Sequence, residues 1–103
     1  MKWFRTDGWM LGDLAAEISM SKDTTLADDE KRPFINFTCS AASKTLTLGL
    51  DVGDTAIVTN IGGTNAVTVK NVAGDTGTSV AAGKTALVVA SKTADASTVL
   101  VLN

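Results

Sequence analysis

From Phe34 to the end of the chain, apolar and polar residues alternate in short runs separated by glycine-rich turns. A period of two places successive side chains on opposite faces of a β-strand. In a first strand over residues 34–39, this period puts Ile35, Phe37 and Cys39 on one face. We predict further strands at residues 45–50, 55–60, 65–71, 78–81, 85–90 and 97–102.

The second of these strands repeats the same pattern, because Leu46, Leu48 and Leu50 share one face. Short strands at regular spacing, with no helical period between them, are typical of an all-β sandwich or barrel and argue against alternating strands and helices. We therefore predict a mainly β fold, a small antiparallel β-sandwich of jelly-roll or Greek-key type.

Two segments of this β region share a sequence frame. Residues 52–58 and residues 82–88 both read small or apolar, Gly, charged, Thr, Ala, Ile or Leu, Val. Greek-key and jelly-roll pairing would produce two equivalent units of this kind, each a turn that leads into a strand. A chance match in a sequence of low diversity is the alternative, and the sequence leaves both open.

The large side chains are concentrated at the front of the chain. All five aromatic residues precede residue 40: Trp3, Phe4, Trp9, Phe34 and Phe37. A large ring supplies much contact area at a low cost in ordering, which suits a docking segment. We predict an N-terminal anchoring arm and linker over residues 1–33 and a β-sandwich module over residues 34–103. The alternative is that the rings fold back and complete the core of the module.

Local structure in the front segment is open to two interpretations. Met10, Leu14 and Ile18 have the spacing of one helix face, whereas Asp7-Gly8 suits the turn of a small hairpin. In the linker, residues 25–28 could cap a single helical turn that ends before the proline. We therefore expect an arm with at most a short helix.

Composition removes several functional classes. A net charge of −2 argues against nucleic acid as a partner, because neutralising phosphates requires a surplus of Lys and Arg. The absence of histidine and the single Cys39 exclude zinc sites and catalysis by a Ser-His or Cys-His pair. The start of the chain has no long apolar run, so we expect neither a signal peptide nor a membrane partner.

Motifs that suggest chemistry are weak. Asp75-Thr76-Gly77 matches the triplet of aspartic proteases, but Gly74 stands where those proteases place an apolar strand residue, so a tight loop explains it better. Lys84 follows a glycine without the upstream glycine of a phosphate-binding loop. We therefore expect a protein that is not an enzyme.

Acidic residues gather in two places, at Asp51 and Asp54 around a turn and in the contiguous run 28–30. Neither has the ligand spacing of a calcium-binding EF-hand loop, and a solvated turn and a solvated charged face account for them. We expect no cofactor and no metal ion.

The β region also resembles a known group of proteins. The residue pattern of this region resembles that of the β modules of tailed-bacteriophage head-fibre and capsid-decoration proteins. The resemblance lies in residues 46–48, 53–60, 62–69, 81–89 and 98–102. This resemblance implies a structural virion protein that is displayed on the capsid surface as a homotrimer and assembled in the host cytoplasm. The long fibrous shaft of many appendages is missing, which favours a compact decoration protein.

The same resemblance implies that the arm anchors the β module to the major capsid protein or to another virion protein. The partner-binding residues would then be Trp3, Phe4, Arg5, Trp9, Met10, Leu11 and Leu14. One alternative is a glycan-binding β module associated with a tail fibre or tailspike, although no aromatic ring follows residue 40 to stack on a sugar. A dimeric aspartic protease that uses Asp75 is a further alternative.

Overall fold

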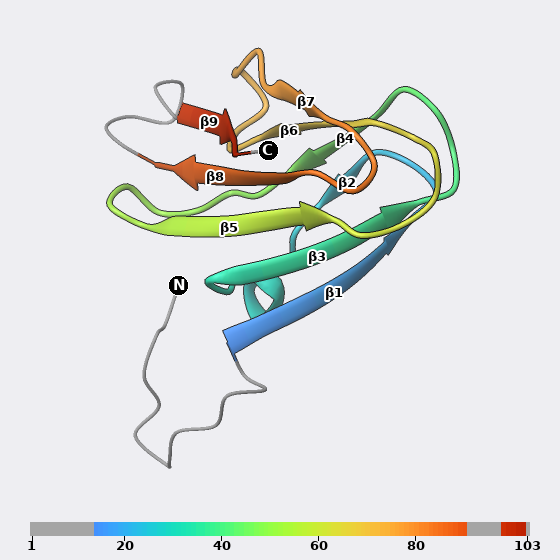
Figure 1. The fold of residues 1–103 in the computed structure, drawn as a ribbon. Helices are drawn as coiled ribbons and strands as arrows, with labels where there is room; N and C mark the ends of the chain where they lie inside the picture. The colour runs from blue at the N-terminus through green and yellow to red at the C-terminus, as the bar shows by residue number, and fades with distance from the viewer. Residues whose placement is uncertain (1–13, 91–97, 103) are drawn as a thin grey trace.

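A computed structural model describes residues 14–90 and 98–102 of the chain. These residues form two β-sheets that lie face to face (Figure 1). Sheet A has the strand order β1 (Ala15–Met20), β3 (Phe34–Cys39), β5 (Thr55–Asn60), β8 (Thr85–Val89) and β9 (Thr98–Val101). Sheet B has the strand order β2 (Thr24–Thr25), β4 (Lys44–Thr47), β6 (Val67–Lys70) and β7 (Thr78–Val80).

The first six strands alternate between the sheets, so that the chain winds through three turns in the manner of a short parallel β-helix. In sheet A, β3 pairs in parallel with β1 and with β5, and in sheet B, β4 pairs in parallel with β2 and with β6. Parallel neighbours require a long crossover connection, and here the strand in the opposite sheet forms part of that crossover. The strands β7, β8 and β9 then add antiparallel pairs.

The prediction of a mainly β fold is confirmed, but strand pairing differs from the antiparallel sandwich that we expected. Four of the seven strand pairs in the described residues are parallel and three are antiparallel. Alternation and turn residues locate strands and bends in the sequence. They do not specify whether the next strand returns to the same sheet or crosses to the other one, because both paths need similar turns.

The predicted strand positions agree closely with the structure. Strands β3 and β5 have the predicted bounds, and the other predicted strands lie within their predicted ranges except that β4 begins one residue earlier, at Lys44. The single helical turn before Pro33 is also present, as a 3-10 helix at Asp28–Glu30. It begins after Ala27 rather than at Thr25, and the Glu30 carboxylate accepts a hydrogen bond of 2.8 Å from the Ala27 amide.

The arm and linker predicted over residues 1–33 contain two strands, β1 and β2. The helix face that we considered through Ile18 is wrong, because Ala15–Met20 is a strand that pairs with β3 along all six residues. Ala16, Ile18 and Met20 point into the core, so alternation with a period of two governs this segment too. The interpretation of residues 6–9 as a hairpin lies outside the described residues.

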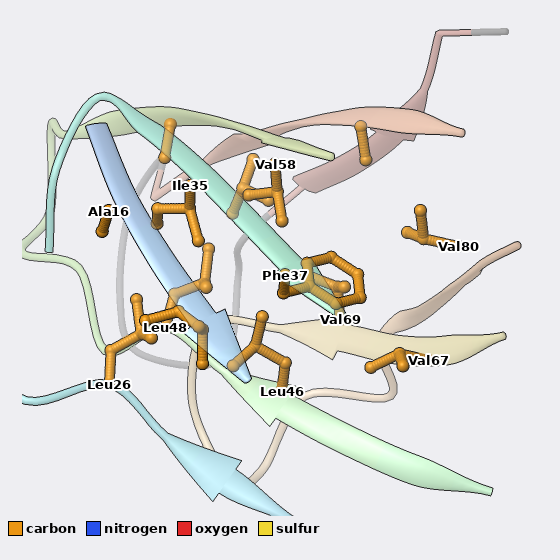
Figure 2. Close-up of a cluster of buried hydrophobic side chains, with 14 of the residues drawn as sticks. Ala16, Leu26, Ile35, Phe37, Leu46, Leu48, Val58, Val67, Val69 and Val80 are labelled. Atoms are coloured by element: carbon orange, nitrogen blue, oxygen red, sulfur yellow. The ribbon is translucent and has the colours of Figure 1, made fainter. Parts of the chain in front are cut away.

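The core fills the space between the two sheets (Figure 2). Sheet A contributes Ile35, Phe37 and Val58, and sheet B contributes Leu46 and Val69, all without solvent exposure. The predicted grouping of residues on shared faces is confirmed, and both faces are buried: Ile35, Phe37 and Cys39 in β3, and Leu46, Leu48 and Leu50 in and after β4. A large ring therefore lies in the core at Phe37, surrounded by aliphatic side chains.

The two segments that share a sequence frame are structurally equivalent. The Gly53 amide donates to the Ala90 carbonyl over 2.7 Å, and the Gly83 amide donates to the Asn60 carbonyl over 2.7 Å. Both glycines have a positive φ, 97° and 82°. Because β5 and β8 pair antiparallel, the two units are related by a local twofold axis, which explains the repeated frame.

Within the described part of the chain, no helix is both long and apolar enough to span a membrane.

Candidate functional site

The outer face of sheet A carries a row of apolar side chains across four strands. The register pairs Phe34 with Ile57, Ile57 with Leu87, and Leu87 with Leu100. Phe34, Ile57 and Leu100 are 42%, 36% and 52% exposed, and Leu87 is half-buried. We call these four residues the apolar row. A contiguous exposed apolar surface is typical of a protein-binding site.

One end of the apolar row reaches the edge strand β1. Ala15 is the register partner of Phe34, so the row ends beside the first residue of β1. Two residues along the strands, Glu17 pairs with Asn36 and contributes an exposed carboxylate to the same face. Charged groups of both signs therefore border this end of the row, because the Arg32 guanidinium donates a hydrogen bond of 3.1 Å to the Ala15 carbonyl.

One strand of sheet A, β8, has an unusual composition for a sheet with one solvated face. Apolar residues occupy both sides of β8, with Ala86 and Val88 inward and Leu87 and Val89 outward. The strands of sheet B alternate more cleanly, as in Lys44–Thr47 with Leu46 inward and threonines outward. Clean alternation is typical of sheets with one solvated face, and near-continuous apolar runs are typical of sheets covered on both faces.

Sheet B has a polar hollow on its surface, with a volume of ≈ 520 Å³. It is open to solvent and is lined by Ala42, Ser43, Lys44, Thr64, Asn65, Ala66, Thr68 and Ser79. Lys44 is the single titratable residue among these lining residues. General acid–base catalysis needs groups that exchange protons near the working pH, and hydroxyl and amide side chains do not supply them. The hollow therefore offers one amine, that of Lys44, among hydroxyl and amide groups.

The structure tests few of the residues that we predicted to bind a partner. Trp3, Phe4, Arg5, Trp9, Met10 and Leu11 lie outside the described residues. Leu14 is described and is half-buried, directly before β1. Leu14 therefore adjoins the edge of sheet A that carries the end of the apolar row.

The protease-like triplet forms a closed turn. The Asp75 amide donates to the Val72 carbonyl over 3.0 Å, and the Asp75 carboxylate accepts a hydrogen bond of 3.3 Å from the Val72 amide. Gly77 has φ 79° and lies so close to β6 that a Cβ atom would stand 2.9 Å from the Val69 carbonyl oxygen. Gly77 thus serves the backbone of the turn, as the sequence interpretation expected, whereas Gly74 has neither a positive φ nor an atom within 4 Å of an added Cβ.

One acidic cluster forms the 3-10 helix Asp28–Glu30, and the other brackets a turn. Asp28 forms an ion pair of 3.0 Å with Lys31, and the Asp54 amide donates to the Asp51 carbonyl over 3.0 Å. Across residues 14–90 and 98–102, no three His, Cys, Asp or Glu side chains are grouped so that they could hold a metal ion. Lys84 is exposed in the turn before β8, where its amide donates to the Ala81 carbonyl.

Two buried asparagines were missed by sequence reasoning. Asn71 is 2% exposed, and its side-chain amide pairs with the backbone of Leu50 through bonds of 2.7 and 3.1 Å. Asn60 is fully buried and donates to the carbonyls of Asn65 and Val80. Both occur at strand ends, where a polar residue in the sequence suggests a turn. Their role is to satisfy buried backbone groups where the chain leaves a sheet.

No protein-family model, no curated protein and no solved structure matches the chain. The resemblance to head-fibre and capsid-decoration proteins is therefore one of residue pattern. The apolar row is the feature of the described surface that is best suited to a partner.

Proposed function

We propose that the protein is a structural virion component that decorates the capsid of a tailed bacteriophage. Its β-sandwich is displayed on the particle as a homotrimer, and its N-terminal segment holds it to the major capsid protein or to another virion protein. The resemblance in the β region motivates the choice of a virion protein. The apolar row is the observation that supports a binding role.

The apolar row favours binding over catalysis for a physical reason. Exposed apolar side chains gain free energy when a partner removes them from water, at about 25 cal/mol for each Å² of buried surface. The row contains no titratable group. Glu17 lies beside it on the same face, and the Arg32 guanidinium donates a hydrogen bond of 3.1 Å to the Ala15 carbonyl at its end. Such a surface can hold another polypeptide but cannot transfer a proton.

Three copies on one particle would strengthen attachment without any further contact. When three short anchors engage neighbouring sites together, the second and third binding events become intramolecular and occur at a high effective concentration. A segment with two tryptophans and a phenylalanine would then need only modest affinity for each site. This arrangement fits a small protein whose anchor has few residues.

The test is removal of the anchor without damage to the fold. The deletion must end at residue 13, because β1 begins at Ala15 and supplies core residues such as Ile18. The truncated and the full chain are each mixed with particles that lack the protein and are sedimented. We expect the full chain to pellet with the particles and the truncated chain to stay in the supernatant.

Two measurements make this result interpretable. Circular dichroism and the mass in solution must be the same for both chains, which shows that the fold and the assembly survive the deletion. A Thr47→Ala variant, altered on the outer face of sheet B, serves as a control and is expected to pellet like the full chain. Equal pelleting of the truncated chain would contradict the proposal.

A further inference from the structure

We propose that the polar hollow on sheet B binds a sugar that carries one carboxylate, such as a hexuronic acid. The hollow lies at the beginning of β4 and β6, beside the loops that lead into these two strands, and Ser79 of β7 completes its wall. This inference does not rest on the proposed function, because it concerns a ligand of the free protein and not its attachment to a particle.

The first argument is the shape of the hollow. Its volume of ≈ 520 Å³ lies within the range of small-ligand sites, about 300–1,000 Å³. Lys44 has the largest side chain of the lining, and the other lining residues are alanine, serine, threonine and asparagine. Small side chains therefore leave the space unfilled. Thr68 and Ser79 are register partners on β6 and β7, so two residues that carry hydroxyl groups lie side by side in the wall.

The second argument is that hydrogen bonds hold the wall in place. The side-chain amide of Asn65 donates to the Cys39 carbonyl over 3.0 Å, which joins the loop before β6 to the end of β3. The fully buried Asn60 side chain donates to the Asn65 carbonyl over 2.9 Å. A site whose groups are positioned before the ligand arrives loses less conformational freedom on binding. These two bonds therefore prepare the Asn65 side of the hollow for a ligand.

The third argument is charge. Lys44 is the single charged residue of the lining, and within the described part of the chain its ammonium forms no ion pair. Asp23 lies near β4, where its carboxylate accepts a hydrogen bond of 2.9 Å from the Thr45 amide, but it does not line the hollow. Lys70, further along β6, donates to the Ala73 carbonyl. The lining thus offers one positive charge, which matches a ligand with one carboxylate.

The fourth argument is that the remaining lining groups suit a sugar better than other anions. The hydroxyl groups of Ser43, Thr64, Thr68 and Ser79 can each donate and accept a hydrogen bond, as sugar hydroxyls do. Phosphate groups are usually bound by arginine forks or by backbone amides at helix N-termini. The lining residues include no arginine and belong to no helix. They also include no aromatic ring, so hydrogen bonds and charge would hold the sugar in place of stacking.

The site is tested by titrating the isotope-labelled full chain with sodium glucuronate and following the amide shifts by NMR. We expect shifts that saturate and that are concentrated in residues 42–44, 64–68 and 79. Glucose supplies the hydroxyl groups without the charge, and acetate supplies the carboxylate without the hydroxyl groups. At equal ionic strength, we expect each of these to bind at least about fivefold more weakly than glucuronate, because each lacks part of the hydrogen bonding.

Two substitutions should weaken the binding of glucuronate. Lys44→Gln removes the charge and should lower the affinity about tenfold or more, and Ser79→Ala removes one hydroxyl group and should lower it about fivefold. Ser79 is exposed, so its variant keeps the test valid if Lys44→Gln fails to fold. The matched control is Lys31→Gln, because the Lys31 ammonium lies beside Gly49, beyond the end of β4 that is opposite to the hollow. We expect the control to bind like the unaltered chain, and circular dichroism checks the fold of each variant.

The other outcomes overturn the inference. Glucuronate shifts that do not saturate, or that lie outside the lining residues, would show that the hollow is not a binding site. Equal affinity of Lys44→Gln and the unaltered chain would remove the role of the charge. Glucose that binds as tightly as glucuronate would indicate a neutral sugar, and acetate or inorganic phosphate that binds as tightly would indicate a site for any anion. The titration uses no particle, so its failure leaves the sedimentation test of the proposed function unaffected.

Discussion

The two sheets of the sandwich share one core but differ in their outer faces. Sheet B presents threonines, Ser79 and Lys70 to the outside, and its strands alternate between apolar and polar. Sheet A presents Phe34, Ile57 and Leu100 on its outer face. Burial between the two sheets explains where apolar residues occur in sheet B. In sheet A it explains the inner face but not the apolar residues on the outer face. The remaining apolar residues of sheet A indicate a second contact surface.

The largest difference in stability is expected between substitutions of two phenylalanines that lie on opposite sides of β3. Phe37 is fully buried between the sheets, whereas Phe34 is 42% exposed. We expect Phe37→Ala to lower the free energy of unfolding by about 3–5 kcal/mol, because it removes a ring from a packed core and leaves a cavity. Phe34→Ala in a chain without residues 1–13 should cost about 0.5 kcal/mol or less. Urea unfolding followed by circular dichroism measures both, and equal losses would remove the distinction between the faces.

The next largest effect on stability is expected at Asn71, whose side chain bonds to the backbone at the end of sheet B. Asn71→Ala leaves the amide and the carbonyl of Leu50 without their present partners, and we expect a loss of about 2–3 kcal/mol. The comparison is Asn36→Ala on the outer face of sheet A, where the side chain is half-buried and water can replace a lost contact. A smaller loss for Asn71→Ala than for Asn36→Ala in urea unfolding would contradict the role of Asn71.

A smaller difference is expected between two turn glycines with similar φ, 79° at Gly77 and 97° at Gly53. Alanine at either position is strained, but a Cβ at Gly77 would also contact β6 of sheet B. At Gly53 no atom lies within 4 Å of the added Cβ. We expect Gly53→Ala to cost about 1 kcal/mol and Gly77→Ala to cost about 1–2 kcal/mol more. Thermal unfolding of the two variants side by side tests this order, and a reversed order would contradict it.

The smallest effect on stability comes from exchanging residue types between the two outer faces. In a chain without residues 1–13, Ile57→Thr and Thr47→Ile should each change the free energy of unfolding by about 0.5 kcal/mol or less. Binding of a hydrophobic fluorescent dye should nevertheless fall for Ile57→Thr and rise for Thr47→Ile, because the apolar surface shrinks in one and grows in the other. Unchanged dye binding in Ile57→Thr would show that the row is not a continuous apolar surface.

The strand positions could be predicted because they depend on local pattern. Alternation located β3 and β5 at their observed bounds and grouped Phe37 with Ile35, and Leu46 with Leu48, on faces that are buried in the structure. The same method failed for β1, because the spacing of Met10, Leu14 and Ile18 also fits a helix face. In the structure, the pairing of Ala15–Met20 with β3 decides in favour of a strand.

The candidate site could not be predicted from the sequence, for a related reason. Phe34, Ile57, Leu87 and Leu100 are spread over four strands, and nothing in the linear order shows that they are neighbours. Their proximity follows from one parallel pairing and two antiparallel pairings with fixed registers. Alternation placed Phe34 on the face opposite Ile35 and Phe37, but it assigned no face in β5, β8 or β9, where adjacent residues are apolar.

The sequence by itself determined a mainly β fold, the strand positions from Phe34 onward, the residues that share a face in β3 and in the segment of β4, and the absence of histidine chemistry, because each depends on side-chain period or on composition. The tertiary structure decided that successive strands cross between the sheets and stack in parallel, that β1 belongs to sheet A, and that four separated apolar residues form one row. Pairing partners lie many residues apart, and the free energy that selects them comes from burying whole faces together. A local pattern does not contain that information.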